Sequence, residues 1–484
     1  MKNTHKLFRI REFFILILMC LLPSFVFAEE IGAVTQLDLK HHFVGYFAVA
    51  VTFIVYAIAM TEDLHQLSKA KPMVLGSALI WGSIFVYYSM EYGSAKNVAV
   101  VFQNNLTAYA ELFLFITVSM TFLNSMTERG IFDALRIVLV NRQYSYRQLF
   151  WITGVLAFVL SLVISSLTVG LLMGYIILVI GKDQPKFVGL AGLNAVVAAN
   201  AGGTISPLGG ISTFFVWQQN MLHFTEFFNL TIPCMVNFLV PASIMHFAVT
   251  KENPVFTKET PALKRGSKRI VFIFIFTFSL TILSNVFFDM PAIAGMMFGL
   301  AILQFFAYYL TKSEKLSHFL IPETRQTIDS KKGFDVFKCI AGVDWDTLLF
   351  FYGAMMIVGA LSFLGYLDAM AHYLFTEISP TLANIMIGLS SSSIDNGTLM
   401  FAVLNMHPPF SMQQWLLLTL TLGVGGSLLA IGSAPALHVL GLMKGNMKEG
   451  EGYTFTLHLR WMPAILLGFF ASIGTLFLLN GGVF

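Results

Sequence analysis

Charged residues are scarce in this chain: Asp, Glu, Lys and Arg make up 11% of its 484 residues, where a soluble domain carries about a quarter. This scarcity excludes a soluble enzyme, a nucleic-acid-binding domain and a disordered scaffold. Cysteine is also rare, and Cys20, Cys234 and Cys339 show no CxxC spacing, so neither a disulfide framework nor a zinc site is expected. The sequence has no Walker motif, which argues against ATP-driven pumping.

The chain is instead rich in apolar residues, which form 56% of the sequence. A membrane helix takes about 20 residues, so the length allows many spans with modest loops. Apolar windows predict eight of them, near 43–60, 73–90, 106–123, 229–249, 270–288, 291–311, 347–366 and 461–481. The predicted fold class is therefore an all-α polytopic membrane protein.

Four further apolar stretches are interrupted by polar or small residues. The stretches 149–181 and 381–410 carry a polar tip at their centre, and we interpret each as a re-entrant hairpin. The stretches 187–216 and 414–443 carry Gly, Ser and Pro, and we interpret each as a broken transmembrane helix. Irregular backbone at membrane depth is tolerated only where protein or a water-filled cavity satisfies it.

The first 28 residues have the pattern of a signal peptide. Basic residues precede the apolar run 13–22, and Val26-Phe27-Ala28 resembles a signal-peptidase site. The alternative is an uncleaved first helix. Either interpretation places residue 30 outside the cytoplasm.

This orientation agrees with the distribution of positive charge. Segments 61–72, 124–148, 182–186, 250–269, 312–346 and 444–460 become cytoplasmic, and they hold 2, 4, 2, 6, 6 and 3 Lys and Arg residues, 23 of the 29. Four more lie in the signal segment, and only Lys40 and Lys96 fall outside. The positive-inside rule requires this asymmetry. It arises only if both hairpins re-enter, the first from the cytoplasm and the second from outside, so the tip at Asp395 should be reached from outside.

The chain also repeats itself in two halves. The stretch Glu111 to Leu135 aligns with Asp346 to Met370 at an offset of 235, and a hairpin and a broken span follow each copy. The predicted organisation is 29–105 for the N-terminal helices, 106–249 for the first inverted repeat, 250–346 for a linker that holds the helices within 270–311, and 347–484 for the second repeat. Inverted repeats with broken helices are typical of secondary transporters.

The polar tips are the candidate ion site. A broken helix exposes unpaired N–H and carbonyl groups, and neighbouring hydroxyl and amide oxygens suit a dehydrated cation or an anion's oxygens. Asp395 favours a cation, because a membrane carboxylate is expensive and usually functional. It can bind Na⁺ and also accept a proton; the alternative is a helix cap. The candidate ion-binding residues are Asp395, Asn396, Thr398, Ser391, Thr168, Ser165, Ser166, Asn200, Thr204, Ser206, Ser427 and Ser433.

Three acidic residues are candidates for a proton relay: Asp395, Glu111 and Asp344. Glu111 lies inside an apolar span, where a structural partner is the alternative. Asp344 opens the 347–366 span, where anchoring at the interface is the alternative. His438 follows the second break, and it is either a hydrogen-bonded packing residue or a pH sensor.

At these positions the chain resembles the NhaD-type sodium/proton antiporters of the wider ion transporter superfamily. The resemblance rests on the stretches 199–209, 160–173, 391–396 and 425–434, and it extends from about residue 43 to the C-terminus. It implies the inverted-repeat fold, a homodimer, and a cation site between hairpin tips and broken helices. The chain departs from the family at two acidic positions. It has Ser165-Ser166 where the family has Asp-Asn, and Gly210 where the family has Asp.

The leading hypothesis is therefore a multi-pass protein of the bacterial inner membrane that exchanges Na⁺ or Li⁺ for H⁺, with Na⁺ at Asp395 and no cofactor or nucleic-acid partner. A permease for an inorganic anion or small organic acid is the alternative, because the hydroxyl-lined first half suits anionic oxygens. A membrane-embedded enzyme is the third, but the spans lack a paired Asp–Asp, a Ser with a His or Lys base, and His-Glu-x-x-His.

Overall fold

The computed structural model describes residues 39–62, 67–142, 144–254, 263–320, 334–448 and 450–480. The predicted signal peptide lies outside these residues. Every regular element described is a helix. Eight are long and apolar enough to cross a membrane. They are α2 (Phe43–Met60), α4 (Ala70–Tyr92), α5 (Lys96–Glu128), η1 (Glu226–Leu230) with α11 (Thr231–His246), α12 (Ser267–Phe288), α13 (Ala292–Leu320), α15 (Trp345–Phe363) and α21 (Phe455–Leu479).

These eight helices coincide with the eight predicted spans, which confirms an all-α polytopic membrane protein. The ends differ where a helix continues beyond its apolar window. Helix α5 begins at Lys96 rather than near 106. Helix α21 begins at Phe455 rather than near 461, because the Thr454 side chain accepts a hydrogen bond from the Leu457 amide at 3.2 Å and caps the first turn.

The four interrupted stretches form pairs of short helices. The first hairpin is α7 (Tyr146–Leu160) and α8 (Ser166–Ile180), and the second is α17 (Pro380–Ser390) and α18 (Asn396–Asn405). The first broken helix is α9 (Pro185–Gly203) and α10 (Ile211–Gln218), and the second is α19 (Met412–Gly425) and α20 (Ala434–Asn446). The remaining elements are α6 (Ile131–Asn141), α14 (Val336–Ala341), α16 (Tyr366–His372) and the π-helical turn η3 (Tyr373–Ile378).

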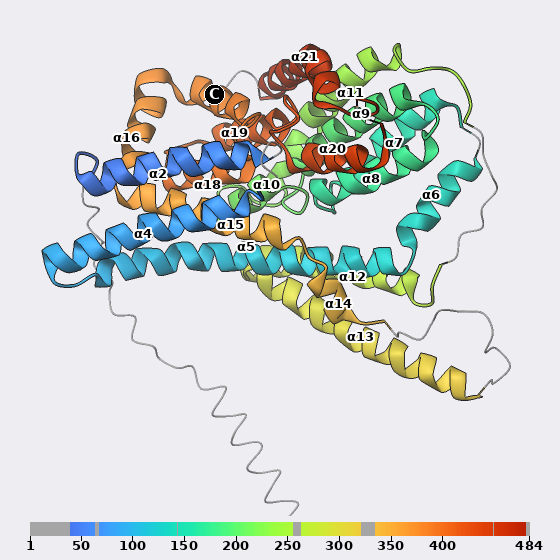
Figure 1. Ribbon diagram of the computed structural model, residues 1–484, viewed down its shortest axis with the longest axis horizontal. Helices are drawn as coiled ribbons and strands as arrows, with labels where there is room; N and C mark the ends of the chain where they lie inside the picture. Colours follow the sequence, from blue (N-terminus) through green and yellow to red (C-terminus); the bar gives the residue numbers. More distant parts are fainter. Residues whose placement is uncertain are drawn as a thin grey trace, which may run out of the picture. The chain divides into compact units, whose positions relative to one another are not determined.

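The order of elements is the same in the two halves: a long helix, a short amphipathic stretch, a hairpin, a broken helix and a long helix. Contacts between the halves are reciprocal. Helix α8 of the first hairpin packs against α20 of the second broken helix, and α18 of the second hairpin packs against α10 of the first (Figure 1). Helices α9 and α19 pack together, as do α11 and α21. This exchange brings both hairpins and both breaks to one region.

Hydrogen bonds bring the two ends of each hairpin close together, to neighbouring residues 249 and 252 at the first and directly to each other's segments at the second. At the first hairpin, the Arg147 guanidinium donates to the Val249 carbonyl at 2.9 Å, and the Gln184 amide donates to the Glu252 carboxylate at 2.8 Å. At the second, the Gln414 amide donates to the Thr381 hydroxyl at 2.8 Å. These contacts support hairpins whose ends lie on one side, while their orientation in the membrane stays a prediction.

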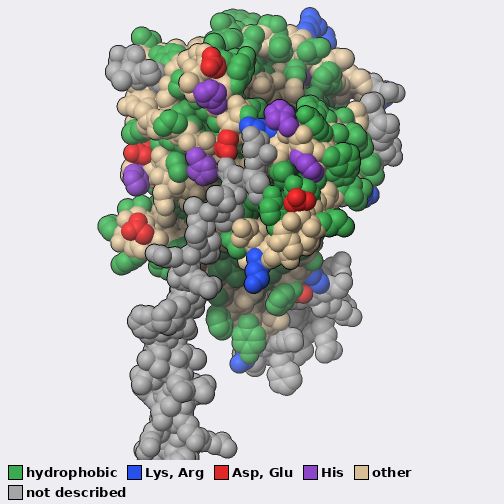
Figure 2. All heavy atoms as spheres, turned by 90° about the vertical axis from the view of Figure 1, so that its left-hand side faces the viewer, with side chains coloured by type: hydrophobic (Ala, Val, Ile, Leu, Met, Phe, Trp, Pro, Cys, Tyr) green, Lys and Arg blue, Asp and Glu red, His purple; other side chains and the backbone are tan. Residues whose placement is uncertain are grey.

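The outward surfaces of the long helices are apolar. Phe53, Phe272, Phe288, Phe305 and Leu478 are each more than two thirds exposed. Figure 2 shows one face, on which hydrophobic side chains cover broad areas and acidic and basic groups are few. Exposed apolar area on this scale marks a surface that contacts something other than water, as expected for helices surrounded by lipid.

Candidate functional site

Each hairpin tip touches the break of its own half through glycine. A Cβ atom on Gly202 would lie less than 3.0 Å from the Phe158 carbonyl oxygen, and one on Gly425 would collide in the same way with the Gly388 carbonyl. Further along each break, a Cβ atom on Gly209 would collide with the Ser161 carbonyl oxygen, and one on Gly432 would collide with the Ser392 carbonyl oxygen. No side chain fits between these backbones, so glycine is required for the close approach.

The first break is held by hydroxyl groups that bond to its own backbone. The Thr204 hydroxyl donates to the Asn200 carbonyl at 2.8 Å, and Ser206 Oγ accepts from the Leu208 amide at 3.2 Å. The Ser166 amide, at the hairpin tip, donates to the Gly209 carbonyl at 2.9 Å. The Thr204 and Ser206 hydroxyls therefore stabilise the irregular backbone, and Ser166 does so through its backbone amide.

The two breaks meet at a buried hydrogen bond. The Asn200 amide donates to Ser427 Oγ at 2.8 Å. The Ser427 carbonyl in turn lies 2.9 Å from His458 Nε2, and His458 Nδ1 lies 2.6 Å from the Tyr453 hydroxyl. Sequence reasoning predicted Asn200 and Ser427 but missed His458 and Tyr453, which stand at the start of α21 and are almost wholly buried. No local pattern distinguishes His458 from an interfacial histidine.

Asp395 is the N-cap of α18. Its carboxylate accepts a hydrogen bond from the Thr398 amide at 3.1 Å, with the Thr398 hydroxyl 3.4 Å away. Tyr56 of α2 lies against the same Thr398 side chain. The capping interpretation of Asp395 thus holds, and it does not exclude an ion-binding role, because the same residue lines a large cavity.

That cavity has a volume of about 790 Å³. It is lined by Asp395, Ser393, Tyr56 and Ser433. Its other lining residues include Glu62, Lys69, Asp344, Asp346 and Lys444, which belong to segments that the charge distribution predicts to be cytoplasmic. We expected Asp395 to be reached from outside; in this conformation its cavity leads to the cytoplasmic segments instead. A tip that enters from one side can be open to the other once it reaches the middle of the membrane.

The first hairpin tip lines a different and much smaller space. Ser165 and Thr168 border a cavity of about 40 Å³ together with Gly210. Thr347, near the start of α15, lines both cavities and so separates them. The structure therefore brings Asp395 and Ser433 together in one cavity and leaves Ser165 and Thr168 in another.

Two other predicted residues have structural partners. The Ser391 hydroxyl is buried and donates to the Gly388 carbonyl at 2.7 Å. Glu111 accepts a hydrogen bond from the Gln218 side chain, which attaches α5 to the end of α10. Asn396 is the first residue of α18 and does not line the large cavity.

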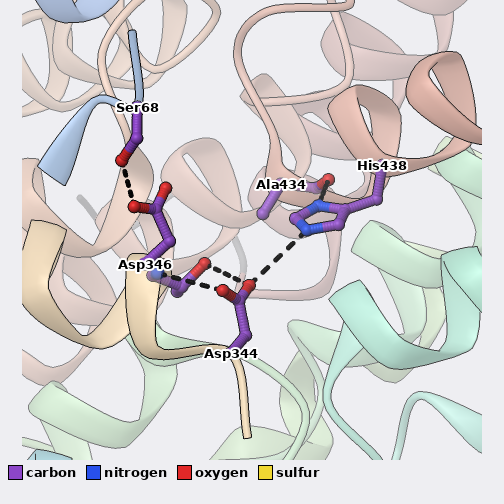
Figure 3. A network of polar contacts seen from close by, with 6 residues as sticks. Ser68, Asp344, Asp346, Ala434 and His438 are labelled. Carbon is purple, nitrogen blue, oxygen red and sulfur yellow. Dashed lines mark hydrogen bonds and ion pairs between the residues drawn. The ribbon is translucent and has the colours of Figure 1, made fainter. Parts of the chain in front are cut away.

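A polar network lies on the wall of the large cavity, in segments predicted to be cytoplasmic (Figure 3). Asp344 caps α15 by accepting from the Thr347 hydroxyl at 2.6 Å and the Thr347 amide at 3.2 Å. Its Oδ2 atom lies 3.5 Å from His438 Nε2 on α20. Asp346 accepts from the Ser68 hydroxyl, which attaches the segment before α4.

Lys69 was not among the predicted site residues. It follows Ser68 in the sequence and lines the cavity. Its ammonium group lies 4.7 Å from the centre of the Phe350 ring, which is a cation–π distance. The sequence showed Lys69 only as one of many cytoplasmic charges, because its neighbours come from distant segments.

Hairpins paired with broken helices, packed reciprocally around a cavity that a half-buried carboxylate lines, define a secondary transporter rather than an enzyme. Comparison with known proteins agrees. The citrate transporter family matches residues 47–425. The Na⁺/H⁺ antiporter NhaD of Vibrio cholerae is 45% identical over 92% of this chain and 94% of its own length. NhaD of Halomonas elongata is 41% identical over 96% and 94%. Sodium/proton antiporter 2 of Arabidopsis thaliana is 25% identical over 83% and 94%.

The chain belongs to the NhaD-type antiporter family, within the citrate transporter family. It is a multi-pass membrane transporter and not an enzyme.

Proposed function

We propose that this protein exchanges Na⁺ or Li⁺ for H⁺ across the bacterial inner membrane, with Asp395 as both cation ligand and proton acceptor. The observation that carries the proposal is the position of Asp395, at the start of a half-helix and on the wall of a 790 Å³ cavity. The relatives that match most of the chain bear the name Na⁺/H⁺ antiporter. The activity stated in that name agrees with the chemistry of this site.

The exchange follows from competition for one carboxylate. Na⁺ is a hard cation that prefers oxygen ligands, and hydroxyl oxygens of Ser393 and Ser433 share the cavity with Asp395. A proton bound to Asp395 removes the charge that attracts Na⁺, and Na⁺ bound to Asp395 removes the site for the proton. In the described part of the chain, no three His, Cys, Asp or Glu side chains form a group able to hold a metal ion, so neutral oxygens must complete the coordination.

The proposed organisation has two inverted repeats, 106–249 and 347–484, preceded by the helices within 29–105 and joined by 250–346. Reciprocal packing of α8 on α20 and of α18 on α10 supports it, because a two-fold relation between halves requires such an exchange. By the charge-based topology, the large cavity is the cytoplasmic access to Asp395. A second state would open the site to the other side, and a homodimer would give the moving helices a fixed support.

The test is transport in everted membrane vesicles from a host without its own sodium/proton antiporters. A pH-sensitive dye reports dissipation of the proton gradient after addition of Na⁺, Li⁺, K⁺ or citrate. We expect responses to Na⁺ and Li⁺, and none to K⁺ at the same concentration. A response to citrate alone would replace this proposal with an anion permease.

A further inference from the structure

His458 lies in the first turn of α21, and its side chain is wholly buried. Its Nε2 atom lies 2.9 Å from the Ser427 carbonyl oxygen. A carbonyl oxygen only accepts hydrogen bonds, so Nε2 carries a proton and donates it. Nδ1 lies 2.6 Å from the Tyr453 hydroxyl oxygen. In an uncharged ring Nδ1 has a lone pair, and the Tyr453 hydroxyl donates to it. The two bonds together fix the tautomer and the orientation of the ring.

Ser427 lies in the second break, just after the end of α19, and other helices hold it from two sides. Its carbonyl oxygen accepts from His458 of α21, and its hydroxyl oxygen accepts from the Asn200 amide of α9 at 2.8 Å. At the corresponding residue of the first break, Thr204, the hydroxyl bonds to its own helix through the Asn200 carbonyl. The break that leads to the half-helix α20 is therefore held from outside, by α9 and α21.

Tyr453 connects this contact back to α9. A Cβ atom on Gly192 of α9 would lie 3.3 Å from the Tyr453 Cβ atom, so the tyrosine packs directly on the helix backbone. The contacts form a closed ring: it leaves α9 at Gly192, passes through Tyr453, His458 and Ser427, and returns to α9 at Asn200. Each member of a closed ring has two restraints. The position of the Ser427 carbonyl is thus determined by three helices together.

The segment that this ring holds leads directly to the candidate ion site. Six residues after Ser427 the chain reaches Ser433, which lines the large cavity with Asp395. On the way, a Cβ atom on Gly432 would collide with the Ser392 carbonyl oxygen, so the break packs closely against the second hairpin tip. The position of the Ser427 peptide therefore influences where the Ser433 hydroxyl lies relative to the Asp395 carboxylate.

Resting on the exchange proposed above, we propose that His458 is a positioning residue for the Na⁺ site. By donating to the Ser427 carbonyl, it holds the second break so that the Ser433 hydroxyl stays beside Asp395, where a cation needs neutral oxygens. His458 itself is not among the residues that line the cavity. Its loss should therefore weaken Na⁺ binding and leave the proton acceptor, Asp395, in place.

The first experiment measures Na⁺-dependent proton flux in proteoliposomes at varied Na⁺. His458→Phe keeps a ring but cannot donate, whereas the side-chain amide of His458→Gln can still donate to the Ser427 carbonyl. In His458→Phe we expect the apparent KM for Na⁺ to rise about tenfold, as for a buried carbonyl that loses its donor, with the maximal rate within about twofold. His458→Gln should return the KM to within about twofold of the parent, because it restores a donor.

Two further variants keep this experiment decisive. Tyr453→Phe removes the hydroxyl that orients the ring and is the milder variant should His458→Phe insert poorly; its KM should lie between those of the parent and His458→Phe. His246→Phe is the matched control, since His246 bonds to Trp151 at 3.0 Å and does not line the cavity, and its KM should equal the parental one. A parental KM in His458→Phe, or an equal rise in His458→Gln, would overturn the proposal.

The second experiment reads the position of the break without transport. Ile431 lies in the break, lines the cavity and is exposed. In a chain whose three native cysteines are replaced by Ser, Ile431→Cys is labelled with a maleimide in the purified protein. We expect His458→Phe to accelerate labelling several-fold, because the break is no longer fixed, and His458→Gln to leave the rate unchanged. Equal or slower labelling in His458→Phe would reject the positioning role, whereas a parent protein without Na⁺ response would reject only the exchange.

Discussion

The two hairpin tips share a backbone design and differ in chemistry. Helix α18 follows Asp395, whose carboxylate caps it by accepting from the Thr398 amide. Helix α8 follows Ser165, whose side chain makes no capping bond. The half-helices after the breaks differ less, since neither the Ser433 side chain before α20 nor Gly210 before α10 makes a side-chain capping bond.

The spaces beside the two tips differ as well: about 790 Å³ beside Asp395 and about 40 Å³ beside Ser165. The glycine contacts that hold tip to break are nevertheless equivalent in the two halves. The same glycine-packed scaffold therefore forms with a carboxylate at the hairpin tip and without one. The first half keeps this architecture with serines at its hairpin tip, where the second half has Asp395.

The largest effect should come from Asp395→Asn, which keeps the shape and the capping acceptor but removes the charge and the proton site. We expect Na⁺-dependent proton flux to fall at least about a hundredfold, as expected when a charge that binds substrate is lost from a low-dielectric site. The amount of protein in the membrane should not change.

Asp368→Asn is the matched control, because it removes a carboxylate from an exposed position on α16. It should leave the flux within about twofold, in the range of ordinary surface substitutions. Full exchange in a correctly inserted Asp395→Asn variant would reduce Asp395 to a helix cap.

The glycine contacts should be equally sensitive in the two halves. Gly202→Ala and Gly425→Ala each place a methyl group against a backbone carbonyl that cannot move aside. We expect each to destabilise the protein by about 2 kcal/mol or more, visible as a lower midpoint of thermal unfolding in detergent. Gly474→Ala on α21 is the control, since its methyl group meets no atom within 4 Å. An effect confined to Gly425 would show that the halves are not mechanically equivalent.

Adding acidic groups to the first half should make its tip resemble that of the second. Ser165→Asp and Gly210→Asp place carboxylates at the starts of α8 and α10, where the chain has no side-chain cap. Because each added ligand charge raises cation affinity, we expect the double variant to bind Na⁺ about tenfold more tightly. The apparent affinity comes from flux at varied Na⁺. The matched control is Ser165→Asn with Gly210→Asn, which adds the caps without the charge and should leave the affinity unchanged.

The smallest effect concerns the bond between the breaks. Asn200→Ala and Ser427→Ala each remove one partner of the 2.8 Å hydrogen bond. A double-mutant cycle on unfolding free energy should give a coupling of about 1 kcal/mol, as expected for a buried hydrogen bond between neutral groups. Purely additive effects would mean that the two breaks are held together by other contacts.

The sequence predicted the eight spans well, because each is an apolar window of the length that a membrane requires. The interrupted stretches were also recognisable, because Gly, Ser and Pro within an apolar stretch indicate a break in a membrane helix. Helix ends were less predictable. Thr454 starts α21 ahead of its apolar window through a capping bond that only the folded backbone reveals.

The candidate site was predicted only in part. Asp395 and Ser433 are distinguished by polar character within apolar sequence, and they share a cavity. Lys69 and Tyr56 lie on the wall of the same cavity although they are more than 300 residues away in the sequence. Their role depends on helix packing, which no local pattern encodes. Ser391 and Thr204 were expected at the site for their hydroxyl groups, but those groups bond to nearby backbone carbonyls.

The central claim is that a single carboxylate, Asp395, carries the exchange. One carboxylate releases about one proton for each Na⁺ that it binds, so no net charge crosses the membrane. The direct measurement is Na⁺-driven proton flux in proteoliposomes whose membrane potential is clamped with K⁺ and valinomycin. With Asp395 as the single carboxylate, we expect rates that do not change between potentials of opposite sign. Strong dependence on the potential in the parent protein would contradict it and would mean that a second acidic group, with Glu111 the first to test, takes part in the exchange.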